Sequence, residues 1–168
     1  MDHSESERSP ETLWFWQHYD ETADHIRDFL ASDGKSLEGK DVADIGCGDG
    51  ITDLGLVHKT SPVRLVGFDV NQTNTDVLSR RAQQEGVGAT LPPQLDFVQS
   101  GETSLPAGDA SFDYVITWSA FEHIQEREIH IPIQYLFSGI RFLCVWRRGT
   151  IDPGRHCRAG VRARAQGT

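Results

Sequence analysis

The sequence has few cysteines, and they form no recognisable pattern. Cys47, Cys144 and Cys157 include no C-x-x-C pair, and an odd number of cysteines argues against a disulfide framework. Disulfides are rare in cytosolic proteins, where thiols are kept reduced. We therefore expect three reduced thiols and a cytoplasmic protein.

Long apolar runs are also absent. The first ten residues are polar and charged, which does not suit a signal peptide. The longest apolar stretch, residues 135–146, is interrupted by serine, glycine and arginine and is too short to span a bilayer. We expect no membrane partner.

A metal-binding pattern is missing as well. The seven histidines are scattered along the chain. No pair of them stands at the i, i+4 helical spacing that, together with an acid, indicates a zinc site. The sequence predicts no metal site.

Positive charge is scarce in most of the chain, and the formal net charge is −9. Residues 1–128 hold 9 Lys and Arg against 24 Asp and Glu, whereas residues 129–168 hold 7 against 1. Because non-specific nucleic-acid binding needs clustered cations, the acidic body argues against a nucleic-acid partner. At 168 residues the chain is one domain by length and can bury a core.

A glycine-rich loop follows the first apolar segment of the domain. Val42 to Ile45 reads as a short strand, glycines follow at positions 46, 48 and 50, and the spacing from Ile51 onward predicts a helix. Glycines permit positive φ and remove Cβ atoms, so backbone N–H groups at the helix start can face a bound molecule. The pattern is typical of a ligand-binding turn.

The charge of this loop indicates which ligand it binds. A dinucleotide site has the spacing G-x-G-x-x-G, whereas this loop has G-x-G-x-G and carries Asp44, Asp49 and Asp53. A carboxylate roughly 5 Å from a phosphate costs about 3 kcal/mol at an effective dielectric constant near 20. A nicotinamide-dependent oxidoreductase is therefore disfavoured. S-adenosylmethionine carries an ammonium and a sulfonium group and no phosphate, so acidic neighbours favour it.

Three motifs in order resemble the class I S-adenosylmethionine-dependent methyltransferases. They are Val-Ala-Asp-Ile-Gly-Cys-Gly-Asp-Gly at 42–50, Leu-Val-Gly-Phe-Asp-Val at 65–70, and the strand with its following turn at 112–124. The resemblance covers about residues 16–124. It implies an α/β fold with a Rossmann-like, doubly wound and mostly parallel sheet, and it implies S-adenosylmethionine as the cofactor.

The resemblance also implies a set of cofactor-binding residues. Asp69 stands at the end of the second strand, 25 residues after Asp44, where it can accept both ribose hydroxyls at about 1.5–3 kcal/mol per charge-assisted bond. The alternative role for Asp69 is a helix N-cap. Gly101 and Glu102 are expected at the adenine amino group, the alternative being a plain loop. The full set is Asp44, Gly46, Cys47, Gly48, Gly50, Asp69, Val70, Gly101, Glu102 and Trp118.

The fourth strand ends at Thr117, Trp118 and Ser119, where substrate and methyl group can be held in line. Methyl transfer depends mainly on that geometry. A base helps when the acceptor is a hydroxyl or a protonated amine, and His123 is the candidate catalytic residue. The alternative is that His123 caps the start of a helix.

A leading helix is predicted from Trp14 to about Leu30, with Asp33-Gly34 as its stop signal. The resemblance places Tyr19 or Trp16 over the methionine part of the cofactor or beside the acceptor. The alternative is an amphipathic helix that buries its aromatic side chains, and this alternative is favoured for Trp14 and Phe15.

The resemblance fades beyond residue 128. We expect a disordered segment at 1–10, a cofactor-binding domain at 11–146 that lacks its last strands, and an Arg-rich unstructured tail at 147–168. Residues 138–146 are the candidate fifth strand. Either the gene is truncated or shifted in frame near residue 130, or this is a natural short form whose tail pairs with a partner.

The sequence thus predicts transfer of a methyl group from S-adenosylmethionine to a small-molecule acceptor. The alternative function is a truncated, inactive cofactor-binding remnant or an interaction module. The segments that usually select the acceptor are the leading helix and the C-terminal part, so the sequence specifies neither the acceptor nor the oligomeric state.

Overall fold

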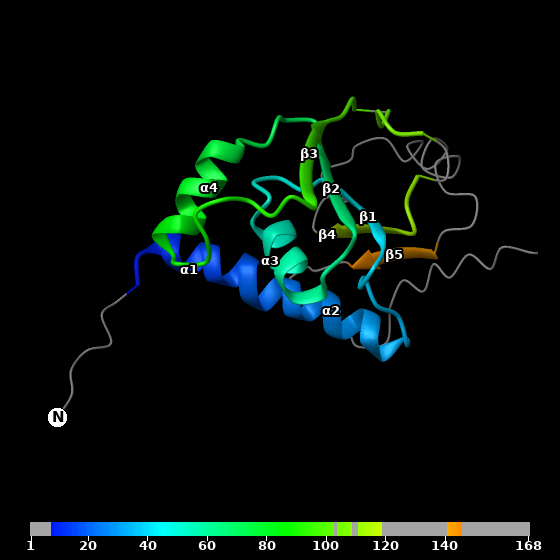
Figure 1. Ribbon diagram of the computed structural model, residues 1–168, viewed down its shortest axis with the longest axis horizontal. Helices are drawn as coiled ribbons and strands as arrows, with labels where there is room; N and C mark the ends of the chain where they lie inside the picture. The colour runs from blue at the N-terminus through cyan, green and yellow to red at the C-terminus, as the bar shows by residue number, and fades with distance from the viewer. Residues whose placement is uncertain (1–7, 103, 109–110, 119–140, 146–168) are drawn as a thin grey trace, which may run out of the picture.

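The computed structural model describes residues 8–102, 104–108, 111–118 and 141–145 (Figure 1). Five parallel strands form one sheet in the order β3-β2-β1-β4-β5. The strands are β1 (Asp41–Ile45), β2 (Arg64–Asp69), β3 (Leu95–Gln99), β4 (Tyr114–Trp118) and β5 (Arg141–Val145). The predicted α/β fold with a parallel sheet is confirmed, and β5 lies within the predicted fifth strand.

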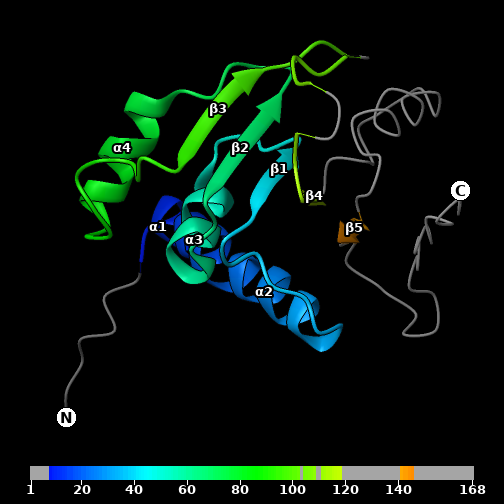
Figure 2. The same cartoon turned by 45° about the vertical axis from the view of Figure 1, so that its right-hand side comes forward.

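The chain moves outward from β1 through β2 to β3 and then returns to the other side of β1 as β4 (Figure 2). The strand order therefore reverses between β1 and β4. In open α/β sheets ligands bind at such a switch point, outside the carboxyl ends of the strands. The glycine-rich loop leaves β1 at this point.

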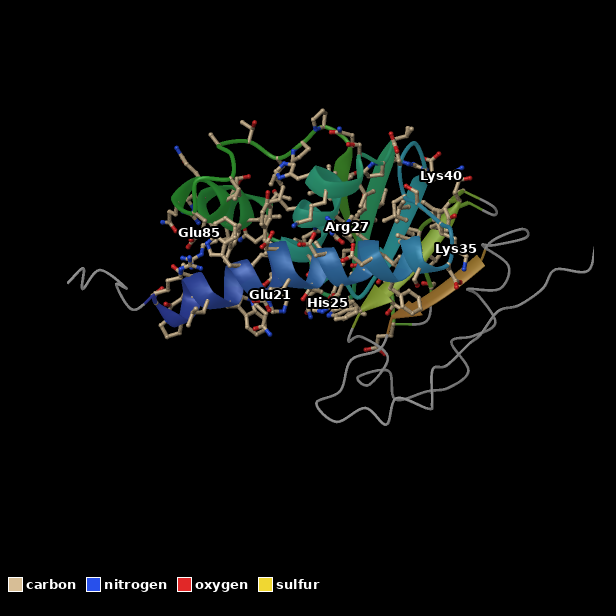
Figure 3. All side chains as sticks on the ribbon, turned by 90° about the horizontal axis from the view of Figure 1, so that it is seen from below. Glu21, His25, Arg27, Lys35, Lys40 and Glu85 are labelled. Carbon is tan, nitrogen blue, oxygen red and sulfur yellow. The ribbon has the colours of Figure 1, made fainter. Side chains whose placement is uncertain are left out.

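Five helical segments accompany the sheet in the part of the chain that the structure describes. They are α1 (Pro10–Trp16), the π-helix η1 (Gln17–Thr22), α2 (Ala23–Ser32), α3 (Ile51–Thr60) and α4 (Thr75–Gln84). The first three follow one another directly and form one long helical rod, with Glu21 and His25 along it and Glu85 near its first turns (Figure 3). None of the helices in the described ranges is long and apolar enough to cross a membrane.

The long rod differs from the single α-helix that the sequence predicted, because a π-helix interrupts it. The backbone carbonyl of Tyr19, in η1, lies so close to Gly55 of α3 that a Cβ on Gly55 would overlap it. A π-helix displaces backbone carbonyls from their α-helical positions, and here one of them lies against the neighbouring helix. The rod begins at Pro10 rather than Glu11, with Ser9 as its N-cap.

The main core lies on the sheet face that the described helices cover. Side chains alternate along each strand, so Val42, Leu65, Leu95 and Ile116 point to the helices, while Ala43, Val66 and Val115 belong to a second cluster. From the helices, Phe15, Ile26, Leu30, Leu54, Leu56 and Leu78 complete the main core. This packing fixes α3, and with it the glycine-rich loop, on the sheet.

The helix that follows β2, α4, starts at Thr75 with Asn74 as its N-cap, whose Oδ1 accepts a hydrogen bond from Val77 N at 3.0 Å. The intervening residues form a loop at the end of β2. The domain limits 11–146, the tail at 147–168 and the disordered start remain predictions, since residues 1–7, 119–140 and 146–168 lie outside the described residues.

Candidate functional site

The glycine-rich loop, residues 46–50, is fastened to the neighbouring strand. Gly46 N and Cys47 N both donate to the carbonyl of Phe68 in β2, at 2.7 and 3.2 Å. Gly46, Gly48 and Gly50 have φ values of 80°, 58° and 78°, which only glycine adopts without strain. The backbone conformation at these three positions therefore requires glycine, as the sequence predicted.

Gly48 and Gly50 have different surroundings. A Cβ on Gly50 would overlap the ring of Phe97, whereas a Cβ on Gly48 would project into open space. Gly50 is buried and Gly48 is exposed. The loop thus packs tightly on its inner side and leaves room for a ligand on its outer side.

Asp69 connects this loop to the end of β2. Its Oδ2 accepts a hydrogen bond from Gly48 N at 3.0 Å, and its Oδ1 accepts one from Asn71 N at 2.9 Å. Because Asn74 caps α4, Asp69 is not the N-cap that was its alternative role. Each carboxylate oxygen has a second lone pair free to accept from a ligand.

The ends of β2 and β3 are joined beside Asp69. Ser100 N donates to the Asp69 carbonyl at 2.8 Å, and Gln99 Nε2 donates to the Val70 carbonyl at 2.9 Å. Val70 is 48% exposed, and Gly101 and Glu102 are exposed in the following turn. The structure therefore brings Asp69, Val70 and the Gly101–Glu102 turn to one edge with the glycine-rich loop.

Trp118 lies at the carboxyl end of β4, next to β1. Its side chain is half-buried and packs against the helix-covered core. Thr117 precedes it and is 3% exposed. The predicted catalytic residue His123 and the neighbouring Ser119 lie outside the described residues, so their roles stay predictions.

Asp44 and Asp53 occupy the inner side of the loop. Asp44 is 3% exposed and Asp53 is fully buried, and among the described residues neither Asp44 Oδ1 nor either oxygen of Asp53 has a hydrogen-bond partner. Burial raises the pKa of Asp44 to about 6. Burial, followed by the charge of Asp44, raises the pKa of Asp53 well above its ordinary value. The expectation that Asp53 adds charge at the ligand was wrong, because its side chain turns into the core.

Cys47 contributes its backbone rather than its thiol. Burial, followed by the nearby charge of Asp53, raises the pKa of the Cys47 thiol far above its ordinary value. Its Sγ lies 3.5 Å from Thr73 Oγ1, and Thr73 donates to the Gly48 carbonyl at 2.9 Å. The neutral thiol thus packs beneath the loop, next to the Thr73 hydroxyl that is bonded to Gly48. Within the described ranges, no group of three or more His, Cys, Asp and Glu residues could hold a metal ion.

The leading helix reaches the loop through a residue that the sequence analysis did not favour. Trp14 Nε1 donates to Asp49 Oδ2 at 3.1 Å. Trp16 Nε1 instead donates to Glu85 Oε2 at 3.0 Å, and the Tyr19 hydroxyl lies 2.8 Å from His58 Nδ1 near the far end of α3. The place of Tyr19 or Trp16 over the cofactor or beside the acceptor stays a prediction. The sequence carries no signal for Trp14, since periodicity does not fix how the helix is rotated.

A shallow cavity of about 360 Å³ lies beside this contact. It opens between α1, the start of α3 and α4. Its walls are Pro10, Glu11, Trp14, Ile51 and Arg81. Since Ile51 directly follows the glycine-rich loop, the cavity adjoins the loop on the side of the leading helix.

Comparison with known proteins identifies the family. Residues 42–138 match the family described as "Methyltransferase domain". The chain is 30% identical over 108 residues to erythromycin 3''-O-methyltransferase of Saccharopolyspora erythraea, covering 64% of this chain and 34% of that protein. It is 32% identical over 84 residues to phthiotriol/phenolphthiotriol dimycocerosates methyltransferase of Mycobacterium tuberculosis, covering 50% and 28%. The chain thus spans about a third of the length of these curated relatives.

A solved structure shares the fold. Magnesium protoporphyrin IX methyltransferase from Synechocystis PCC 6803, solved with bound S-adenosylmethionine, superimposes with a TM-score of 0.53 at 22% identity, covering 82% of this chain and 63% of that one. The predicted Rossmann-like arrangement is confirmed by this likeness. The residues that match the family, 42–138, include the glycine-rich loop and Asp69. This chain belongs to the methyltransferase domain family, within the class I S-adenosylmethionine-dependent methyltransferases.

Proposed function

We propose that this chain binds S-adenosylmethionine and takes part in methyl transfer to a small-molecule acceptor. The observation that carries the proposal is the arrangement of Gly48 and Asp69. The exposed glycine faces open space and donates its N–H to a carboxylate at the end of the adjacent strand, at 3.0 Å. This combination lies at the switch point of the sheet, where a nucleoside ligand fits.

The residues present fit the cofactor. The Gly46–Gly50 backbone would hold its amino-acid part, with the unpaired Asp44 Oδ1 as a buried anionic acceptor below. Asp69 would accept the ribose hydroxyls through its remaining lone pairs. The exposed Val70 side chain would cover one face of the adenine, and the Gly101–Glu102 turn would hold its edge.

Bound S-adenosylmethionine supplies a methyl group that its sulfonium activates toward nucleophiles. The contribution of the protein is to orient that group and its acceptor, because correct alignment provides most of the rate. Trp118 at the end of β4 would help to hold the acceptor and the methyl group in line. His123 is proposed as the base for an acceptor that must lose a proton.

The class of acceptor is inferred from charge and from relatives. The net charge of −9 disfavours nucleic acid, whose phosphates need clustered cations. The relatives are described as methyltransferases of erythromycin and of phthiotriol dimycocerosates, which are not macromolecules. A reduced Cys47 is consistent with a reaction in the cytoplasm.

Calorimetric titration with S-adenosylhomocysteine tests cofactor binding, and titration with NAD tests the dinucleotide alternative. We expect heat with the first ligand and none with the second. Transfer of a labelled methyl group to a panel of small hydroxyl, amine and carbon acceptors then tests activity. Binding without transfer to any acceptor would favour a cofactor-binding remnant over an enzyme.

A further inference from the structure

Asp44 and Asp53 form a buried pair of acids beneath the glycine-rich loop. On the helix-covered face, Phe97 of β3, Gly67 of β2 and Asp44 of β1 stand side by side in register. A Cβ on Gly67 would lie 2.6 Å from Asp53 Oδ2 and 2.7 Å from Phe97 Cδ1. The missing side chain of Gly67 therefore provides the space into which α3 inserts the Asp53 carboxyl.

The contact between the two acids requires a proton. Asp44 Oδ1 and both oxygens of Asp53 accept no hydrogen bond from any donor among the described residues. The Asp53 carboxyl lies against Gly67, which is the register partner of Asp44, so the two acids are neighbours. Two carboxylates buried side by side repel strongly, and a proton on one of them supplies the missing hydrogen-bond donor. One of the two groups is therefore protonated.

The surrounding charges decide which group keeps the proton. Besides burial, the charge of Asp69 in β2 raises the pKa of Asp44, and the charges of Asp44 and then Asp49 raise the pKa of Asp53. Every charged group that perturbs the pair is an acid, and no described lysine, arginine or histidine compensates it. Both oxygens of the fully buried Asp53 lack a donor, whereas only Oδ1 of Asp44 does, so Asp53 holds the proton and Asp44 titrates first.

We propose that Asp53 is a positioning residue: its protonated carboxyl donates to Asp44 and holds Asp44 as a single oriented anion beneath the glycine-rich loop, ready for the cationic end of the ligand. The ligand-facing part rests on the proposed function. The shared proton does not, because it follows from the free protein alone. Asp53 itself touches no reacting atom.

The proposal predicts a pH dependence of cofactor affinity. Binding a cation favours the charged form of Asp44, whose pKa lies at about 6 in the free protein. Affinity for S-adenosylhomocysteine, which retains the ammonium group, should therefore rise as pH increases through about 6. Below that pH, binding should release a proton, which calorimetry in buffers of different ionisation enthalpy counts directly.

Two substitutions separate positioning from packing. Asp53→Asn keeps a donor of the same shape, so its affinity and its pH midpoint should match the wild type. Asp53→Leu keeps the volume but loses the donor, and the midpoint should move up by about one to two pH units. At pH 7 its affinity should fall about two- to tenfold and should recover at higher pH. A role in packing alone would lower affinity equally at every pH.

Two results would overturn the proposal. The first is weak binding of Asp53→Asn at every pH, which would mean that a charged Asp53 is needed. The second is an unshifted midpoint for Asp53→Leu. Infrared spectroscopy of the free protein provides a readout without ligand, and it remains available if Asp53→Leu does not fold. A protonated-carboxyl band at pH 7 should be present in the wild type and lost in Asp53→Asn, and its absence from the wild type would contradict the shared proton.

Failure of the proposed function would look different. If the wild type shows the protonated-carboxyl band but binds no S-adenosylhomocysteine at any pH, the cofactor assignment and the ligand-facing role of Asp44 both fail. If the wild type binds and the two variants depart from the expected pattern, only the role of Asp53 fails.

Discussion

The inner and outer sides of the glycine-rich loop differ in what they offer. We call the buried inner residues the floor: Asp44, Gly50, Asp53, Gly67 and Phe97. We call the exposed or half-buried outer residues the rim: Trp14, Gly48, Asp49, Asp69 and Val70. Both sets contain acids and glycines, and both lie at the same edge of the sheet.

The difference shows how one loop combines rigidity with access. On the floor, glycines make room for neighbouring side chains, and acids pair with each other through a proton. On the rim, a glycine leaves room for a ligand, and an acid accepts from backbone N–H groups while keeping lone pairs free. The floor therefore fixes the shape of the loop, and the rim provides its binding groups. Substitutions in the two sets should have separable effects.

The largest expected effect is that of Gly50→Ala on stability. The added Cβ would overlap Phe97, and the alanine would have to adopt the positive φ of 78° that Gly50 has. Overpacking and left-handed strain together should lower the free energy of unfolding by about 2–4 kcal/mol. Chemical denaturation measures this loss.

Gly48→Ala is the matched control, since its φ is 58° and its Cβ would meet open space. It should cost only about 1–2 kcal/mol of stability. It should nevertheless abolish binding of S-adenosylhomocysteine, because the methyl group occupies the ligand's space. Equal stability losses for the two variants would erase the distinction between floor and rim.

Asp69→Ala tests the rim. Loss of the carboxylate should weaken S-adenosylhomocysteine binding by about 1.5–3 kcal/mol, which calorimetry measures. The exposed Asp28 on α2, far from the loop, provides the control: Asp28→Ala should bind as the wild type does. An unchanged affinity in Asp69→Ala would remove this residue from the site.

The pH dependence of stability tests the floor. The raised pKa values of Asp44 and Asp53 mean that the folded state binds protons more tightly than the unfolded state, so stability falls as pH rises from about 4. Asp44 stops contributing to this slope above about pH 6. Above that pH the wild type should lose about 1.4 kcal/mol per pH unit relative to Asp53→Asn while Asp53 stays protonated.

Urea unfolding at a series of pH values measures this difference. Asp28→Asn, a substitution at an exposed carboxylate, should follow the wild type. Parallel curves for the wild type and Asp53→Asn would show that Asp53 is charged in the folded protein, contrary to the account of the floor.

The smallest expected effect concerns the contact of the leading helix with the rim. Trp14→Phe removes the indole N–H bonded to Asp49 and keeps an aromatic ring. It should lower stability and ligand affinity by about 0.5–1.5 kcal/mol each. Trp16→Phe removes the equivalent bond to Glu85 and should lower stability alone. If both variants bind as well as the wild type, Trp14 only anchors α1.

The rim was largely predictable from the sequence because its signals are local. The three glycines follow an apolar strand directly, and Asp69 ends the next one. The parallel sheet then brings these strand ends to one edge. The Gly101–Glu102 turn also lies at that edge, and its role at the adenine stays a prediction.

The floor and the leading helix were less predictable because they depend on contacts between distant segments. The burial of Asp53 follows from the absence of a side chain at Gly67, in the next strand of the chain, and spacing alone does not reveal such a gap. The contact of Trp14 depends on the rotation of the long rod, which the close approach of Tyr19 and Gly55 sets. Periodicity predicts a helix but not its rotation or a π-helical turn.

Calorimetric titration of the wild type and Gly48→Ala with S-adenosylhomocysteine tests the central claim most directly. The account predicts saturable binding to the wild type and its loss in Gly48→Ala, with both proteins folded by circular dichroism. Absence of binding to the folded wild type, or undiminished binding to Gly48→Ala, would contradict it.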